Sequence, residues 1–433
     1  MFKKTVVVAL TLLCVLGSFM WGSGQKDEQA KKAAEPITLN FWFPTASEVS
    51  DGAFVQHAAD FSKLNPGIKV VTTAIASHGA EMEQKLNTSQ LAGTFPDVFS
   101  SVLFLIGTRG AKGDFLEITK YVNSWADKDD LLQSAMDMGY YKGKLIGLGY
   151  FPAPIMNVYR KDFYAEAGLD PNKGPSNWEE LRAFAKKATT YDNAGNIKRA
   201  GMDLPTSDGQ VVVYEAYARN NGSPVIDEVN QVPAFTDEGS IGALQYLADL
   251  WKEKISFPFH MQDFGNYPFL NNRSALGMMM TNLITQMVQG DPAVKAQLGY
   301  APPLTQKVKK NFCGYRLFTI GVNSKHPDES WEFIKFMMSL DNIKLREEKV
   351  GTPPPRKSMA EAYIKKDPGL NSAILEHVKY GKGKPVTPWT SIYSQYMSVA
   401  YEEALSGKKT AQQALMDADR ELKAELKKQG YLK

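Results

Sequence analysis

Short apolar runs alternate with helix-like patterns in the first hundred residues of this chain, and this alternation restricts the folds that the sequence can adopt. Residues 37–43 (ITLNFWF), 68–71 (IKVV) and 98–99 (VF) have the apolar and β-branched composition of strands. Between these runs, residues 51–64 and 81–91 repeat apolar side chains at helical spacing. A strand–helix–strand–helix–strand order predicts a parallel sheet covered by helices, so the sequence favours an α/β fold.

The same alternation continues through the rest of the chain. Helix-like patterns cover residues 178–190, 243–254, 330–339 and 410–428, and apolar strand-like runs cover 275–281 and 318–323. Ser176 is expected to cap the helix that begins at Trp178. We expect Trp178, Trp331 and residues 278–280 to be core side chains, because large apolar residues at these spacings usually pack against the interior.

Length and composition indicate a folded chain with more than one lobe. The 433 residues are 43% hydrophobic and 11% aromatic, which is enough for buried cores. A chain of this length exceeds what one hydrophobic core usually holds, so we expect two lobes. The net charge of +3 gives no overall field that would recruit nucleic acid. Cys14 and Cys313 are the only cysteines, so no intramolecular disulfide is expected once Cys14 is removed or lipidated.

The first 24 residues have the pattern of an export signal. Lys3 and Lys4 precede an apolar run over residues 5–16, and small residues follow at 22–24. The apolar run is shorter than the roughly 20 residues needed to cross a bilayer. We therefore expect residues 1–24 to be a signal peptide.

The residues around the end of this signal bear on whether the exported protein is released or stays anchored to a membrane. Residues 25–36 are charged and of low complexity, and we interpret them as a flexible tether. Free export to the periplasm or the extracellular space is our preferred reading. A lipid anchor at Cys14 is the alternative, although Leu13 stands where a small residue normally precedes a lipidated cysteine.

Searches for catalytic and metal-binding patterns find no strong candidate. The five histidines are scattered, with no pair at i,i+4 and no accompanying cysteine cluster. The sequence has no nucleophile elbow, Walker A run or dinucleotide fingerprint. Acidic groups at 127–130, 179–180 and 402–403 could be interpreted as paired carboxylates for glycoside hydrolysis. Each group lies in a polar, helical or turn-like stretch, so a position on a solvent-exposed face explains it more simply. We therefore expect no enzyme activity, no catalytic residues, no metal and no cofactor.

An ordered series of short motifs runs along nearly the whole chain after the tether. In order they are LNFWF at 39–43, FSKLNPGIKV at 61–70, KLNTSQLAGTFPDV at 85–98, YKGKLIGL at 141–148, VYRKDFYAEAGL at 158–169, PSNWEEL at 175–181, SKHPDESWEFIKF at 324–336 and GTPPPR at 351–356. In this order and spacing the motifs resemble the family 1 extracellular solute-binding proteins of ABC transporters, the group that includes maltose-binding and other sugar-binding proteins. The match to the family's glycine pair is poor, because Cys313 stands where the first glycine is expected.

This resemblance implies a fold, a function and a partner. The implied fold is α/β, of the periplasmic binding protein type II, with two lobes joined by a multi-crossover hinge. The implied N-lobe covers residues 37–149 with 309–347, and the C-lobe covers 150–308 with 348–433. The implied function is that of a monomeric receptor that binds a sugar or oligosaccharide between the lobes and delivers it to a membrane permease, while a separate ATPase supplies the energy.

The candidate ligand-binding residues lie at predicted strand ends and lobe crossings, because ligands of open α/β sheets bind beyond the carboxyl ends of strands. Their flat aromatic faces, hydroxyls, amides and charges are the groups that a sugar requires. By resemblance, Tyr150 lies at a hinge, and Asn282 lies in a region where many relatives carry a tryptophan. The candidates are Trp42, Thr45, Ser100, Tyr150, Asn282, Tyr315, Arg316 and Trp389.

Two other functions remain open on the sequence alone. An exported carbohydrate-active enzyme would share the signal and the aromatic content, but it would need a pair of essential cleft carboxylates. A receptor of the same fold for a metal, an anion or a polyamine would have a cleft dominated by charge rather than by aromatic faces.

Overall fold

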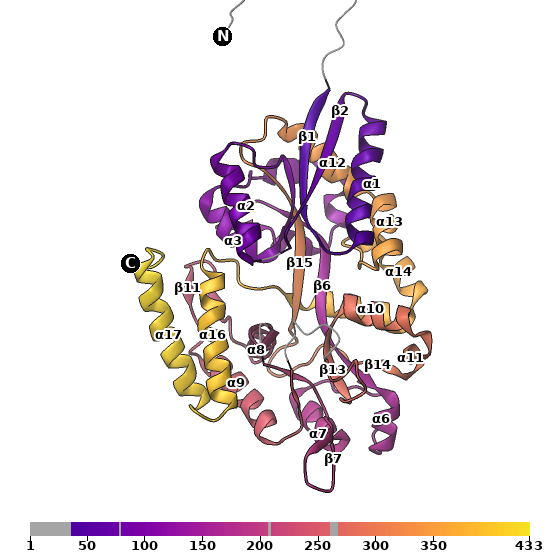
Figure 1. Ribbon diagram of the computed structural model, residues 1–433, viewed down its shortest axis with the longest axis vertical. Coiled ribbons are helices and arrows are strands. Elements are labelled where there is room, and N and C mark those ends of the chain that lie inside the picture. The colour runs from indigo at the N-terminus through magenta and orange to yellow at the C-terminus, as the bar shows by residue number, and fades with distance from the viewer. Residues whose placement is uncertain (1–35, 78, 207–208, 260–266) are drawn as a thin grey trace, which may run out of the picture. The chain divides into compact units, whose positions relative to one another are not determined.

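The computed structural model describes residues 36–77, 79–206, 209–259 and 267–433 (Figure 1). The predicted signal peptide, nearly all of the tether, His78 and His260 lie outside these residues. Every strand and helix predicted above is present, and most ends differ by a few residues, but the strand predicted at 318–323 covers Asn311–Ile320.

The strands of the main sheet are β1 (Ile37–Pro44), β2 (Ile68–Ile75), β3 (Val98–Val102), β6 (Leu148–Arg160), β13 (Leu276–Met280), β14 (Leu298–Tyr300), β15 (Asn311–Ile320) and β16 (Gly381–Lys382). Further two-stranded pairs are β4 (Tyr140–Tyr141) with β5 (Lys144–Leu145), β7 (Thr190–Tyr191) with β8 (Ile197–Arg199), β9 (Leu204–Pro205) with β12 (Pro258–Phe259), and β10 (Ile226–Asp227) with β11 (Val232–Pro233).

The helices up to residue 220 are α1 (Glu48–Leu64), α2 (Gly79–Leu91), α3 (Leu103–Lys112), α4 (Thr119–Ser124), η1 (Ala126–Asp130), α5 (Gln133–Asp137), α6 (Lys161–Glu166), α7 (Trp178–Ala188) and α8 (Gly209–Asn220). The later helices are α9 (Glu238–Lys252), α10 (Thr281–Gly290), α11 (Pro292–Gln297), α12 (Pro327–Met337), α13 (Leu340–Val350), η2 (Lys357–Met359), α14 (Ala360–Lys366), α15 (Pro368–Lys379), α16 (Thr390–Leu405) and α17 (Ala411–Lys428).

The main sheet is mixed rather than wholly parallel. Strand β1 pairs in parallel with β2 and β3, which confirms the predicted strand–helix arrangement. Strand β15 then pairs antiparallel with both β3 and β6, and β13 and β14 pair antiparallel with β6. The strand order is β13-β6-β15-β3-β1-β2, so β6 and β15 lie side by side and join the two ends of the sheet (Figure 1).

The alternation of side chains along β1 explains why helices cover both faces of this part of the sheet. Phe41 and Phe43 pack with Phe54 of α1, and the Phe41 and Phe54 rings meet edge to face at 5.3 Å. Trp42 points to the opposite face and packs in the cluster that contains Met82 of α2. Successive side chains of a strand point to opposite faces, so the apolar run at 41–43 is typical of a strand buried on both sides.

A second core forms around α7, α8 and α9. Trp178 is buried and stacks on Tyr246 at 4.4 Å, which confirms its predicted core position. The predicted cap is wrong by one residue: Asn177 caps α7 by accepting a hydrogen bond from the backbone N–H of Glu180. Ser176 instead donates its hydroxyl to the Glu180 carboxylate at 2.7 Å, because it lies one residue outside the position that can reach the free amides of the first turn.

The long strands β6 and β15 pass through the regions where lobe crossings are predicted. The predicted boundary at 149/150 falls inside β6, and the one at 347/348 falls inside α13. These lobe boundaries remain a prediction.

Candidate functional site

A cavity of about 320 Å³ lies between α3, α8 and the N-terminal half of α16. Its walls combine one aromatic ring, one aliphatic side chain, one ammonium group and several hydroxyl and amide groups. The lining residues are Phe104 of α3, Val211 of α8, Lys384, and Thr390, Ser391, Ser394, Gln395 and Ser398 of α16. Six of these eight side chains are polar or charged, so the cavity offers mainly hydrogen-bonding groups beside a small apolar surface.

Other hollows on the protein are less suited to a solute. An internal cavity beside Trp178 and Tyr217 has a volume of only about 30 Å³, which is room for about one or two water molecules. A hollow of about 450 Å³ beside α14 and α15 contains Lys366, but this lysine is already paired with Glu347 at 2.6 Å. A hollow of about 560 Å³ at the turn between α16 and α17 contains Lys409, which is paired with Asp417 at 2.9 Å.

The spacing of polar residues along α16 places them on one face of the helix. Ser391, Ser394, Gln395 and Ser398 follow one another by three, one and three residues, which keeps them within one stripe of a helix with 3.6 residues per turn. The opposite face carries the buried residues Tyr393, Met397 and Ala400. Packing of that apolar face therefore fixes the direction of the polar stripe toward the cavity.

Ser394 is the most informative of these residues. Its Oγ atom is buried, and it has no hydrogen-bond partner among the residues that the structure describes. A buried hydroxyl without a partner costs roughly 1–3 kcal/mol. Ser394 lines the cavity, but in this conformation its hydroxyl oxygen is shielded from the space inside it.

A close approach of α3 to residues 383–387 forms one wall of the cavity. A Cβ atom at Gly107 would lie 2.2 Å from the carbonyl oxygen of Thr387, and one at Gly383 would lie 2.0 Å from Leu103. Neither position has room for a side chain, so glycine at both positions allows the two segments to pack.

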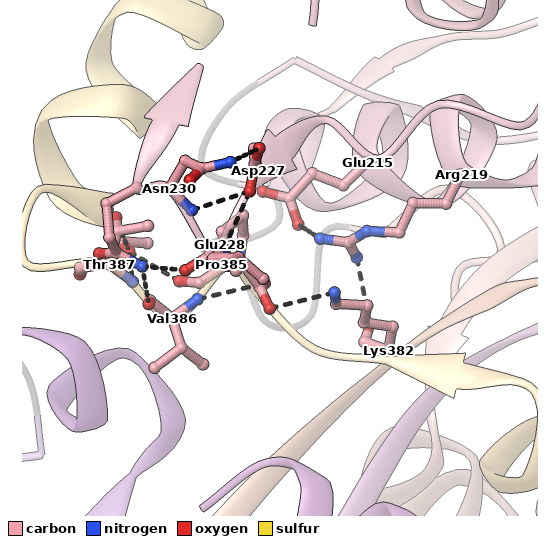
Figure 2. Close-up of polar contacts among 12 residues, drawn as sticks. Glu215, Arg219, Asp227, Glu228, Asn230, Lys382, Pro385, Val386 and Thr387 are labelled. Carbon is pink, nitrogen blue, oxygen red and sulfur yellow. Dashed lines mark hydrogen bonds and ion pairs between the residues drawn. The ribbon is translucent and has the colours of Figure 1, made fainter. Parts of the chain in front are cut away.

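Hydrogen bonds hold the segment before α16 in place (Figure 2). The Thr390 hydroxyl donates to the Pro385 carbonyl oxygen at 2.7 Å, and the Thr387 N–H donates to the Thr390 Oγ1 at 3.3 Å. The Glu228 carboxylate accepts from the Val386 N–H at 3.4 Å. These contacts fix the start of α16, and with it the direction of the polar stripe.

A buried ion pair on α8 lies next to this segment. Glu215 and Arg219 are one turn apart on α8, both are almost fully buried, and their side chains meet at 3.2 Å (Figure 2). Arg219 also donates to the Lys382 carbonyl oxygen at 3.3 Å. Burial raises the pKa of Glu215, while the positive charges of Arg219 and then Lys384 oppose that rise.

The structure brings several of the predicted site residues into contact with other side chains. The Ser100 and Tyr150 hydroxyls are buried and lie 2.7 Å apart, and the Tyr150 ring stacks on Phe318 at 4.0 Å. The Tyr315 hydroxyl lies 2.5 Å from that of Ser134. In this conformation, these hydroxyls already have protein partners.

The candidates near the end of β1 form a separate group. Arg316 donates to the carbonyl oxygen of Pro44 at 3.5 Å, and this places it beside the exposed residue Thr45. Trp42 is 8% exposed, and the Lys85 ammonium lies 5.1 Å from the centre of its ring. Trp42 and Arg316 lie within β1 and β15 rather than at strand ends, which differs from the prediction, and none of these residues lines the cavity at α16.

Of the last two candidates, Trp389 and Asn282, the structure describes the side chain of Trp389 only. Trp389 is only 1% exposed and packs in the core beneath α16, directly before the cavity residue Thr390. Asn282 is the second residue of α10, and its side chain lies outside the described residues. The ligand-binding roles of all eight candidates remain predictions.

The cavity residues on α16 were not identified from the sequence. The signal that could have found them is the polar spacing at 391, 394, 395 and 398 within a helix whose other face is aromatic and aliphatic. Trp389 lies directly before these residues in the sequence.

The acidic groups that could suggest glycoside hydrolysis are engaged in structural contacts. Asp130 accepts from Arg356 at 2.8 Å and from the Ser358 hydroxyl at 2.7 Å. Glu180 and Glu403 pair with neighbouring lysines, and the hydrogen bonds at Glu180 lower its pKa to about 2. Within the described ranges, no group of three or more histidine, cysteine or acidic side chains is arranged to hold a metal ion.

Comparison with known protein families shows to which family this chain belongs. The sequence profile of the bacterial extracellular solute-binding proteins matches residues 45–344, which is more than half of the 433 residues. The chain belongs to this family. Its members bind solutes outside the cytoplasm, and in the described part of this solute-binding protein no helix is both long and apolar enough to cross a bilayer.

Relatives of this solute-binding protein match along almost their entire length. The probable amino-acid ABC transporter periplasmic-binding protein y4oP of Sinorhizobium fredii is 23% identical over 100% of both chains. The sn-glycerol-3-phosphate-binding periplasmic protein UgpB of Pectobacterium atrosepticum is 22% identical over 96% of this chain and 95% of its own. The solved structure of the sugar-binding protein MalE from the phytopathogen Xanthomonas citri has a TM-score of 0.80 and 20% identity, and the match covers 91% of this chain and 98% of that chain. This likeness confirms the expected fold, α/β of the type II periplasmic binding proteins.

Proposed function

We propose that this solute-binding protein binds a hydroxyl-rich solute, a sugar or an oligosaccharide, in the cavity at α16 and delivers it to an ABC transporter permease. The observation that carries the proposal is that the polar stripe of α16 and Phe104 of α3 line the same cavity. Hydroxyl and amide groups pair with sugar hydroxyls, and an aromatic face covers the C–H surface of a sugar ring. The name of the structurally similar MalE protein supports the same solute class.

The mechanism follows from the placement of the cavity walls. Phe104 lies on α3, which packs against the main sheet through β3 and β15, and α16 packs mainly against α8, α9 and α17 and also contacts α3. A solute that contacts both walls stabilises the arrangement in which they are close, and it can shift the population only through such differential contacts. The closed form is then the state that a permease recognises, and the protein acts as a monomer.

A binding role accounts for the site better than catalysis does. The eight residues that line the cavity include no carboxylate and no histidine, so the lining provides no acid–base pair of the kind that hydrolysis of a glycosidic bond requires. Incubation with oligosaccharides should therefore leave them uncleaved.

Calorimetric titration with neutral and acidic mono- and oligosaccharides is the direct test. We expect at least one sugar to bind, and at one hundred times its dissociation constant it should stabilise the fold by about 2.7 kcal/mol. Gln395→Ala should weaken binding by about 3- to 10-fold, because it removes hydrogen bonds worth roughly 0.5–1.5 kcal/mol each. Gln412→Ala, at an exposed position of α17, is the matched control and should bind as the wild type does. Absence of binding to every sugar would refute the proposed solute class.

We also propose that the protein is exported by its N-terminal signal and released without a lipid. The basic residues Lys3 and Lys4, the short apolar run after them, and Leu13 before Cys14 support this reading. Mass spectrometry of the protein from its native host should find a mature N-terminus near Gln25. An acylated Cys14 would contradict it.

A further inference from the structure

One charged group beside the cavity has no partner. Three cations, Arg219, Lys382 and Lys384, lie near three carboxylates, and the carboxylate of Asp227 accepts hydrogen bonds from Asn230 rather than from a cation. Arg219 pairs with Glu215 at 3.2 Å, and Lys382 pairs with Glu228 at 3.1 Å (Figure 2). Among the residues that the structure describes, Lys384 makes no side-chain hydrogen bond and no ion pair within 4.0 Å. Lys384 is therefore the cation left over.

The remaining charge lies in the wall of the cavity. Lys384 is half-buried and lines the cavity together with the polar stripe of α16. None of the other seven lining residues carries a charge. A concave site lined by one sign of charge, with low-dielectric walls, concentrates ligands of the opposite sign.

A purely structural role for Lys384 explains less of the geometry. Burial raises the pKa of the Glu215 carboxyl, and the positive charge of Lys384 lowers it. The lowering by Arg219 is larger. Arg219 contacts Glu215 directly and is itself buried, whereas Lys384 faces the cavity. The charge of Glu215 therefore has its own partner without Lys384.

We propose that Lys384 selects a solute that carries a negative charge. The solute class is a sugar or polyol with a carboxylate or phosphate group, in which the hydroxyls meet α16 and the anionic group meets the Lys384 ammonium. A charge-assisted hydrogen bond of this kind is roughly twice as strong as a neutral one. This inference rests on the proposed function, because it assigns the charge of the solute bound at the same site.

The test compares matched solutes that differ in charge. Glucose, glucuronate and glucose 6-phosphate are titrated separately into the wild-type protein, and glycerol and glycerol 3-phosphate serve as a smaller pair. We expect at least one anionic member to bind on the order of 30-fold more tightly than its neutral counterpart, as for a hydrogen-bonded charge pair in a partly buried site. The two anionic arms distinguish a carboxylate from a phosphate. Raising the salt concentration should reduce the preference.

Variants assign the preference to one side chain. Lys384→Gln should reduce the ratio of anionic to neutral affinity by a similar factor, and Lys384→Arg should retain most of it. Lys365→Gln, at an exposed lysine of α14, is the control and should leave the ratio unchanged. Thermal unfolding checks that each variant is folded. If Lys384→Gln does not fold, the inference is judged from the affinities of the wild-type protein for neutral and anionic solutes and from their salt dependence.

The outcomes separate this inference from the proposed function. Equal affinity for neutral and anionic members, or a preference that survives in Lys384→Gln, overturns the inference and leaves the sugar receptor intact. Binding of none of these solutes or of the wider sugar series overturns both.

Discussion

Asp203→Asn is expected to stabilise the protein at pH 8 and to have a much smaller effect at pH 4. Asp203 is fully buried, and one of its carboxylate oxygens accepts from the backbone N–H of Phe269 at 3.2 Å. The other oxygen is buried without a hydrogen-bond partner among the described residues. Burial raises the pKa of Asp203 from 3.8 to about 7.

The direction of this effect follows from proton linkage. The unfolded chain loses the Asp203 proton near pH 4, whereas the folded protein retains it up to about pH 7. The folded state therefore binds more protons between these values, so the free energy of unfolding falls as the pH rises through this window. A shift of about three units corresponds to about 4 kcal/mol above pH 7. Asparagine is neutral throughout and keeps an oxygen that can accept from Phe269.

Urea unfolding of both proteins at pH 4, 6 and 8 measures the effect. The stability difference between variant and wild type should grow toward pH 8 by up to about 4 kcal/mol. Asp341→Asn, at an exposed position in the first turn of α13, is the matched control for loss of a carboxylate. A difference that stays constant between pH 4 and pH 8 would show that Asp203 is ionised in the folded protein over this range.

The sequence predicts the framework of this protein well, because the framework depends on local periodicity. The strand predicted at 37–43 becomes β1, and residues 51–64 become most of α1, because the spacing of apolar side chains decides which faces are buried. Trp178 and Trp331 are in the core for the same reason. The antiparallel pairing of β15 between β3 and β6 is not visible in the sequence, since the spacing of apolar residues does not specify strand direction.

The candidate site is less predictable because it depends on contacts between distant segments. Gly107 and Thr387 approach each other only after α3 and the chain before α16 have packed. Strand ends indicated residues such as Ser100 and Tyr150, and the structure places these two against each other. The cavity instead uses a helix face, whose serines resemble an ordinary solvent-exposed stripe until the opposite wall is known.

Ser391→Trp is the second change with a large expected effect, and it acts on binding rather than on stability. Ser391 is an exposed residue at the start of α16 and lines the cavity. An indole ring there would occupy much of the space of about 320 Å³ that a solute needs. We expect affinity to fall by about 100-fold or more, because the solute would lose its contacts with both walls. Stability should change by no more than about 0.5 kcal/mol, as is usual at exposed positions.

The measurement that tests the central claim most directly is calorimetric titration of the tightest-binding sugar into wild type, Ser391→Trp and Val399→Trp. Val399 is 56% exposed on the same helix but does not line the cavity, so its variant controls for the added ring. The account predicts wild-type affinity for Val399→Trp and loss of binding for Ser391→Trp, with both variants folded. Wild-type affinity in Ser391→Trp would contradict the assignment and place the solute elsewhere on the protein.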